Sequence, residues 1–308
     1  MKYLLRLILT MLLVSLLTFV AFELVSGDPA QTMLGTEATA EQVQALRSEL
    51  GLDRPFFQRY FSWVSGFVTG NLGNSYSYRQ PVWDLIKSKL VLSLYLCLLS
   101  FALIAAVSIP LALASYRWNG KTINIIRTVL NQLCMAVPPF FIGIIFSWIF
   151  GITLRLFTPG DFNGSFVHLF FAAACLAIPR IAMTVRLLRS TIVSEMNKGY
   201  VRTAISRGND RARVLRVHTL KNSMVSVVSF LGQTLAELVG AGIVVEQVMG
   251  IPGLGRFLVT SILHRDYPVI QTIAVILAFW VVAAGMVADL VNLAIDPRLR
   301  QSSEGESL

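Results

Sequence analysis

Long apolar runs without a charged side chain constrain this sequence more than any other feature. Five of them are Leu7–Phe22, Leu90–Tyr116, Thr128–Leu154, Phe162–Pro179 and Tyr267–Ala288. A sixth, Met224–Val245, is interrupted only by Glu237. A helix needs about 20 mostly apolar residues to cross the hydrocarbon core of a membrane. The runs therefore predict an all-α membrane protein with six transmembrane helices.

The overall composition agrees with this prediction. Only 14% of the 308 residues are charged and the mean hydropathy is +0.66, whereas soluble domains are about 25% charged. The first run follows Lys2 and Arg6, as in a secretory signal, but it is longer than the roughly 7–15 apolar residues of a signal and SGDPA, Ser26–Ala30, offers no clear cleavage site. We expect residues 1–26 to be a retained first transmembrane helix.

The cysteines and histidines do not have the spacing of a metal site or a disulfide framework. Cys97, Cys134 and Cys175 fall in three separate apolar runs, and His168, His218 and His264 are far apart on different predicted sides or depths. We expect buried thiols and no metal site.

Lysines and arginines indicate the orientation of the chain. If the N-terminus is inside, the inner segments hold 16 of them, nine within Arg186–Lys221, and the outer segments hold nine, largely balanced by acids. Inner loops of membrane proteins carry such a basic excess. Both termini are therefore predicted to be cytoplasmic, and the net charge of +9 needs no nucleic-acid partner.

The outer segment 27–89 is long enough to have structure of its own. Thr39 to Gln42 has the form of a capping box, with Gly51 placed to end the short amphipathic helix that follows. A second helix is expected after Pro55, with Phe57, Tyr60, Phe61 and Val64 on one face at the outer interface of the membrane.

Prolines lie within or at the end of three membrane runs. These are Pro110, the pair Pro138–Pro139, and Pro179 at the end of the fourth run. Because each proline frees a carbonyl group, we expect kinked helices that line something wetter than lipid.

The predicted cytoplasmic stretch Tyr200–Asn222 combines an apolar face with a strong positive charge. Val201, Ala204 and Ile205 recur at helical spacing, Gly208 suits a helix end, and Asn209 or Asp210 can cap a second helix. A basic loop that touches anionic lipid would explain the charge alone. The apolar face, bounded by Arg202, Arg207 and Arg211, favours a knob that docks in the groove of a partner.

This stretch resembles the EAA loop of ABC-importer permeases, in which Glu-Ala-Ala is followed by Gly and then by Ile-x-Leu-Pro. Ala204, Gly208 and Leu220 match at the expected offsets, whereas Arg202, Thr203, His218 and Lys221 depart from the pattern. The version YVRTA…RG…RV…H.LKN is similar to that of the dipeptide, oligopeptide and nickel permeases. The same branch is echoed by LGLDRPFFQRY, GNLGNS, PVWDLI, GIPGLGRFLVTSILHRDYPVIQ and DPRLR, in the right order along the chain.

The resemblance implies a type I ABC-importer permease fold in the bacterial cytoplasmic membrane. It divides the chain into a first helix at 1–26, an extracytoplasmic loop at 27–89, a five-helix core at 90–294 with the coupling loop at 186–222, and a cytoplasmic tail at 295–308. The implied partners are a second, homologous permease in a heterodimer, two cytoplasmic ATPases that bind ATP and Mg²⁺, and an extracytoplasmic solute-binding protein. The chain has no GxxxxGK[ST] motif and is not expected to be an enzyme.

The resemblance also implies roles for particular residues. The coupling loop would contact the ATPases through Val201, Arg202, Ala204, Ile205, Arg207, Gly208, Asn209 and Arg211. Glu237 and Gly240 are expected at the translocation pathway or a subunit interface, although Glu237 is also consistent with a hydrogen-bonded structural acid. Pro252, Gly253 and Gly255 are expected at an outer gate or a contact with the binding protein, or in a plain turn.

The expected function is ATP-driven import of small peptides by alternating access. Import of nickel or a metal chelate by the same type of importer remains an alternative. A secondary transporter that uses Glu237 as its ion site is disfavoured because the sequence shows no internal repeat. A membrane enzyme has no clustered nucleophile, base or metal set to support it.

Overall fold

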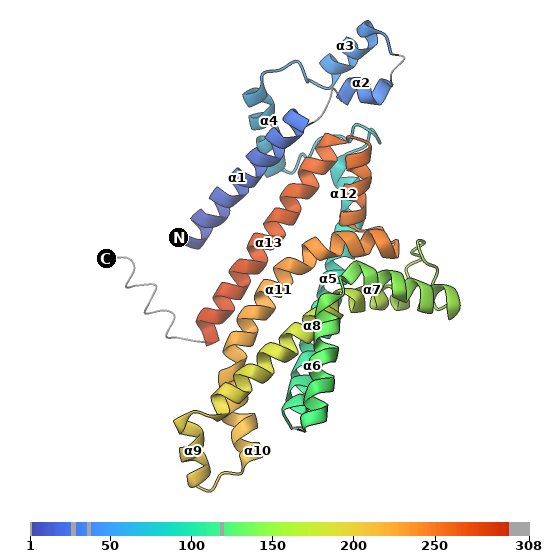
Figure 1. Cartoon of the computed structure of the whole chain (residues 1–308). Coiled ribbons are helices and arrows are strands. Elements are labelled where there is room, and N and C mark those ends of the chain that lie inside the picture. Colours follow the sequence, from blue (N-terminus) through green and yellow to red (C-terminus); the bar gives the residue numbers. More distant parts are fainter. Residues whose placement is uncertain (1, 26–28, 36–37, 118–119, 296–308) are drawn as a thin grey trace. The chain divides into compact units, whose positions relative to one another are not determined.

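The computed structural model describes residues 2–25, 29–35, 38–117 and 120–295. Within these ranges the chain is almost entirely helical and has no β-strand, and Asn74 and Pro81 form an isolated antiparallel bridge. Figure 1 shows the whole chain, which divides into two compact units: Met1–Ser93 with Pro252–Val282, and Leu94–Ile251 with Ala283–Leu308. The motif DPRLR, part of SGDPA and the predicted tail after Ile295 lie outside the described residues.

The first unit contains five helices and the beginnings of two longer ones. They are α1 (Lys2–Val25), α2 (Pro29–Leu34), α3 (Ala40–Glu49), α4 (Phe56–Thr69), α12 (Leu254–Leu263), and the first parts of α5 (Val82–Arg117) and α13 (Tyr267–Ile295). The predicted capping box begins α3: the Thr39 hydroxyl accepts the Gln42 N–H, and the Thr39 N–H donates to the Gln42 side chain. Both short helices of segment 27–89 are confirmed, whereas α2 has no counterpart in the prediction.

Aromatic contacts hold α4 against α1. The ring of Phe19 lies 5.2 Å from Phe56 and 5.5 Å from Tyr60, edge to face, and the Tyr60 hydroxyl lies 2.9 Å from the Ser15 hydroxyl. Phe57 and Phe61 remain exposed. The predicted single aromatic face is therefore split, because Tyr60 packs inward on α1 while its neighbours point away from it.

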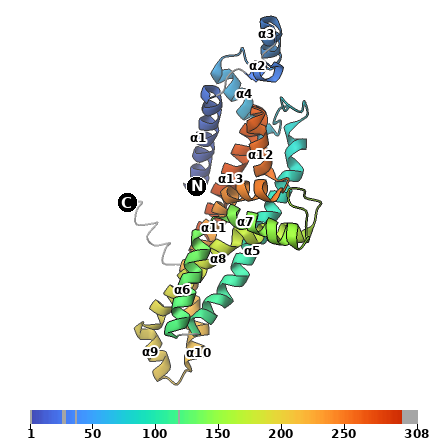
Figure 2. The same cartoon turned by 45° about the vertical axis from the view of Figure 1, so that its right-hand side comes forward.

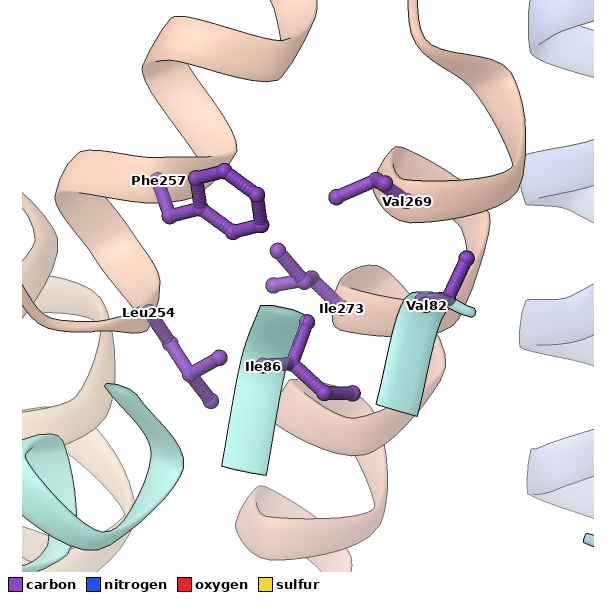
Figure 3. Packing of buried hydrophobic residues seen from close by; sticks show 6 residues of the cluster. All are labelled: Val82, Ile86, Leu254, Phe257, Val269 and Ile273. Carbon is purple, nitrogen blue, oxygen red and sulfur yellow. The ribbon is translucent and has the colours of Figure 1, made fainter. Parts of the chain in front are cut away.

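A small hydrophobic core joins α5, α12 and α13 within the first unit (Figure 3). Its members are Val82, Ile86, Leu254, Phe257, Val269 and Ile273, all buried. A side-chain hydrogen bond supports this core, since the Leu254 N–H donates to the Ser93 hydroxyl at 2.8 Å. This packing fixes where α12 begins.

The second unit is built around α8 (Phe166–Met196), whose residues are the most extensively buried of its helices. It packs against α6 (Lys121–Ala136), α7 (Pro139–Phe146) and α11 (Leu220–Met249). Alanines at 172, 173, 177 and 182 are buried along α8, and small residues allow helices in a membrane to approach closely. The π-helices η1 (Ser147–Thr153) and η2 (Leu215–Thr219) extend α7 and precede α11.

Four helices are long and apolar enough to cross a membrane in the described part of the chain. They are Val82–Arg117, Phe166–Met196, Arg211–Met249 and Tyr267–Leu293. A fifth crossing arises if Lys121–Ala136 and Pro139–Thr153, bent by 95°, form one broken span. The break falls at Pro138–Pro139, as the sequence predicts, because proline cannot continue a helical hydrogen-bond ladder.

The fourth predicted run differs from the observed helix. Pro179 lies inside α8, and the helix continues past Arg180 to Met196. The first residues of the predicted coupling loop, 186–196, therefore form the last turns of α8. Pro110 also lies inside its helix, α5.

Candidate functional site

Two short helices form a hairpin between α8 and α11. Helices α9 (Gly199–Ser206) and α10 (Arg211–Val214) lie side by side in both views, beyond the ends of the two long helices (Figures 1 and 2). This α9–α10 hairpin, residues 197–219, is the helix, elbow and helix that the sequence predicts.

The elbow depends on a left-handed glycine. Gly208 has φ +84° and donates its N–H to Ile205 at 2.9 Å, a conformation that glycine adopts without steric cost. Asn209 donates both its backbone N–H and its side-chain amide to the carbonyl of Ala204, at 3.3 and 3.1 Å. Of the two predicted caps for the second helix, the structure uses Asp210, whose carboxylate accepts an N–H of the first turn of α10 at 3.1 Å.

Three apolar residues of the hairpin are buried. Val201, Val214 and Leu215 have 2%, 0% and 4% of their surface exposed. Val201 therefore does not belong to the exposed surface of the expected knob. Ile205 is 43% exposed and Ala204 is half-buried, so these two carry the apolar part of the exposed surface of α9.

Charged side chains surround this apolar surface. Arg202, Arg207 and Arg211 are exposed. We call Ala204, Ile205 and these three arginines the hairpin surface. An apolar centre with a charged rim is the usual anatomy of a protein interface.

A buried carboxylate secures the base of the hairpin. Glu195, near the end of α8, is 8% exposed and accepts the Tyr200 hydroxyl at 2.9 Å and the Lys198 ammonium group. It links α8 to α9 across the two residues between them. Sequence reasoning missed Glu195 because only the fold brings Tyr200 back to it.

An ion pair connects α8 and α11. The Arg180 guanidinium pairs with the Glu237 carboxylate, and the Gln233 amide donates to the same carboxylate at 3.0 Å. The side chains are 24% and 37% exposed. Glu237 therefore has structural partners and is also partly exposed.

The exposed face of α11 is largely polar, apart from Gly240 and Val244. Residues at intervals of three or four turn outward along the helix: Ser226, Ser229, Gln233, Gly240, Val244 and Gln247 are exposed, and Glu237 is partly so. We call this set the α11 stripe. The opposite face is largely apolar, with Val227, Leu231, Leu238, Val245 and Met249 buried. The buried acid Glu246 was also missed in the sequence.

Other apolar helices of the chain expose a different surface. Helix α6 exposes Ile126, Val129, Leu130 and Leu133, and α13 exposes Phe279, Val287 and Leu290. Such faces suit lipid or an apolar partner. The α11 stripe has the opposite character, which indicates contact with water or with a polar partner.

The glycine-rich segment before α12 is largely packed. Gly253 caps α12, and Gly253 and Gly255 are buried whereas Pro252 is exposed. Of the three residues expected at an outer contact, Pro252 alone presents its side chain at the surface.

Another buried carboxylate orders the first unit. Asp266 is fully buried and accepts the Tyr76 and Ser77 N–H groups, at 3.1 and 3.2 Å, and the Ser75 hydroxyl. These bonds fix the loop before α5 against the turn before α13. The sequence does not signal this contact, because its partners are far apart along the chain.

A cavity of about 660 Å³ opens in the first unit, among α3, α4 and the loop before α5. Its charged lining residues are Arg47, Arg54, Arg59 and Asp53, so the cavity is basic. Among the described residues no group of three or more His, Cys, Asp or Glu side chains is arranged to hold a metal ion.

Two family models match this chain. The model described as binding-protein-dependent transport system inner membrane component matches residues 106–301, and the N-terminal model of the same membrane components matches residues 1–97.

Individual relatives cover nearly the whole chain. A protein of Brucella abortus (strain 2308), named for a peptide transport system permease, is 34% identical over 297 residues, 94% of this chain and 95% of its own length. The glutathione transport system permease protein GsiC of Escherichia coli (strain K12) is 31% identical over 299 residues, 97% of each chain.

The fold is also similar to a solved structure. An inward-facing crystal structure of the MetNI methionine ABC transporter matches with a TM-score of 0.57 and 17% identity. The match covers 69% of this chain and 96% of that one. At this identity the similarity concerns the fold.

Proposed function

This chain belongs to the family of binding-protein-dependent transport system inner membrane components, and we propose that it carries small peptides across the bacterial cytoplasmic membrane. It is the permease subunit of an ABC importer. The observation that carries the peptide assignment is the 34% identity, over 94% of this chain, to a protein named for peptide transport. The relative named for glutathione, which is itself a small peptide, supports the same class of solute.

The proposed topology has six transmembrane helices and two cytoplasmic termini. The four long apolar helices and the bent pair would supply five crossings, and α1 would supply the sixth. The basic excess of the segments at Arg117–Arg127 and Arg186–Lys221 supports this orientation. Segment 27–89 would then lie outside with α3, α4 and the basic cavity.

The hairpin surface is proposed to dock into a groove of a cytoplasmic ATPase subunit. Ile205 and Ala204 would enter the groove, while Arg202, Arg207 and Arg211 would meet its acidic or polar rim. Because α9 and α10 continue into α8 and α11 through short connections, movement of the docked hairpin would be passed to both long helices. Gly208, Asn209 and Asp210 would keep the elbow in shape, and Val201 would support it from within.

Other subunits complete the proposed importer. A second, homologous permease would form a heterodimer with this chain, and two ATPases would bind ATP and Mg²⁺. A solute-binding protein would deliver peptides from outside, where Pro252, presented by the buried Gly253 and Gly255, is a proposed contact. The basic cavity suits acidic side chains of that protein.

Reconstituted importer tests this proposal. Purified permeases, ATPases and binding protein in liposomes should accumulate a labelled dipeptide only when ATP is present. Uptake that survives ATP depletion but collapses with a proton uncoupler would instead identify a secondary transporter.

A variant of the hairpin surface tests the docking. Ile205→Glu should abolish copurification of the ATPase while the permease remains at normal abundance. Val217→Glu, at an apolar η2 residue that is 53% exposed, introduces the same charge outside α9 and should retain the ATPase. Retention of the ATPase by Ile205→Glu would contradict docking through this surface.

A further inference from the structure

We propose that the Arg180–Glu237 ion pair is a binding site on the path of the solute. The two charged ends of a peptide would bind there to Arg180 and Glu237 in place of the contact between these two side chains. This inference rests on the proposed function, since it concerns the solute class carried. It adds a binding site whose ligand is a zwitterion. The ammonium group of the ligand would bind Glu237 and its carboxylate would bind Arg180.

The ion pair lies far from the ends of its two helices, yet both of its side chains are partly exposed. Arg180 lies near the middle of α8 and Glu237 near the middle of α11. A charge at such depth is costly in lipid and normally faces protein or a water-filled cavity. Yet 24% of the Arg180 side chain and 37% of the Glu237 side chain remain exposed in this chain. The open side of the pair must therefore face something polar.

The residues around the pair extend this polar surface along the membrane. The α11 stripe places Ser229 and Gln233 on one side of Glu237, and Gly240 and Gln247 on the other. Gly240 has no heavy atom of the described chain within 4 Å of where a Cβ would lie, beyond its own helix, so the surface is open beside the carboxylate. The Ser229 hydroxyl already donates to Asn292 Oδ1 of α13 at 2.9 Å, whereas the Gln247 amide can bond the N–H and C=O groups of a peptide.

The chemistry of exchange keeps the charges balanced. At rest the guanidinium and the carboxylate neutralise each other, which limits the cost of placing both within the membrane. A zwitterionic peptide brings one charge of each sign, so each member can leave its partner for an end of the peptide without becoming unpaired. Gln233, which donates to Glu237 at 3.0 Å, would hold the carboxylate in position meanwhile. No covalent bond is made or broken.

One arm of the test asks whether the stripe faces water. In the complete importer, with Cys97, Cys134 and Cys175 replaced by alanine, single cysteines are placed at Ser226, Gln233 and Gln247. The matched controls are Val129→Cys and Leu133→Cys on the apolar exposed face of α6. A membrane-impermeant thiol reagent should modify the stripe cysteines about tenfold faster than the controls. Equal rates would overturn the proposal.

The second arm distinguishes an ion pair that binds the solute from one that only stabilises the fold. Arg180→Gln with Glu237→Gln removes both charges, and Arg180→Glu with Glu237→Arg exchanges them. Dipeptide uptake and ATPase activity are measured with saturating loaded binding protein, and melting temperature reports the fold. The neutral pair should keep the wild-type melting temperature and stimulated ATPase activity but import about tenfold less dipeptide per ATP. The exchanged pair should import more than the neutral pair.

Two outcomes of this second arm would overturn the proposal. If the neutral pair imports dipeptide as well as the wild type, the two charges do not serve the solute, although peptide import itself stands. The neutral pair could instead melt below the wild type. If the exchanged pair then restores the melting temperature but imports no more than the neutral pair, the ion pair only stabilises the fold. A wild-type importer that carries no peptide would instead contradict the proposed function, and the inference would fall with it.

Discussion

The buried carboxylate of Asp266 accepts the backbone N–H of Tyr76 at 3.1 Å, which joins the turn before α13 to a loop 190 residues earlier in the chain. The same carboxylate accepts the Ser77 N–H and the Ser75 hydroxyl, and the Ser75 oxygen in turn accepts the Tyr78 N–H at 2.9 Å. A single acidic side chain thus orders a whole loop. Replacing it should leave several donors without an acceptor.

We expect Asp266→Ala to destabilise the protein strongly. An unsatisfied buried donor costs about 1–3 kcal/mol, and this variant loses the acceptor of three donors. The free energy of unfolding should fall by about 3 kcal/mol or more, measured by denaturation of the purified protein in detergent. Asp84→Ala is the matched control, because Asp84 pairs with Lys87 at 2.7 Å but is 53% exposed; its effect should stay below about 1 kcal/mol. Equal effects of the two variants would refute this role.

Tyr76 should make stability depend on alkaline pH. Burial raises the pKa of its phenol to about 12 from 10.0, against an opposing effect of the nearby Arg59 charge. Because the folded-state pKa is the higher one, the stabilisation is complete below pH 10 and is lost as the pH rises from 10 through 12. Between these pH values the melting temperature of Tyr76→Phe should therefore fall less than that of the wild type, measured by differential scanning fluorimetry. Parallel pH profiles would contradict the prediction.

Gly208→Ala should disturb the elbow through backbone strain alone. Gly208 has φ +84° and nothing in the described part of the chain within 4 Å of an added Cβ, so no steric clash contributes. An alanine in this left-handed conformation costs about 1–2 kcal/mol, enough to lower ATP-dependent uptake severalfold if the hairpin docks as proposed.

Gly199→Ala provides the control for the elbow variant. Gly199 also has space for a Cβ, but it begins α9, where alanine is favourable. This variant should retain uptake at the wild-type level. Equal loss of uptake in both variants would show that the left-handed backbone at Gly208 is not the cause.

Local signals in the sequence predicted those features of the fold that neighbouring residues determine. The Thr39 capping box, the helix after Pro55 and the elbow at Gly208 all depend on residues within a few positions of one another. The break at Pro138–Pro139 belongs to the same class. Propensity and capping chemistry suffice for such features.

Features that depend on tertiary contacts could not be predicted in this way. Arg180 suggested the end of a membrane run, but α8 continues to Met196 and Arg180 pairs with Glu237 on α11. Val201 had the same helical spacing as Ile205, and only tertiary packing distinguishes the buried side chain from the exposed one. Asp266 was overlooked for the same reason, since its donors lie 189 to 191 residues earlier in the chain.

A close approach of α11 to α13 at Gly232 and Ala288 leads to a last prediction. A Cβ added at Gly232 would lie 2.1 Å from the Cβ of Ala288 and 3.0 Å from its Cα, so Gly232→Ala must push the two helices apart. Overpacking of this kind costs about 1–3 kcal/mol, which should outweigh the gain of up to about 1 kcal/mol from replacing glycine by alanine within a helix. Melting of the purified protein in detergent measures the net loss.

Two further variants separate this contact from helix propensity. Gly285→Ala on α13 has no atom of the described chain within 4 Å of the new Cβ, outside its own helix, and should be neutral or stabilising. Adding Ala288→Gly to Gly232→Ala removes the Cβ that the new side chain would meet at 2.1 Å and should recover much of the lost stability. Because Ala288→Gly alone costs about 0.5–1 kcal/mol in a helix, a double variant more stable than Gly232→Ala can only reflect relief of the clash. If the double variant is the less stable of the two, α11 and α13 do not meet at these residues.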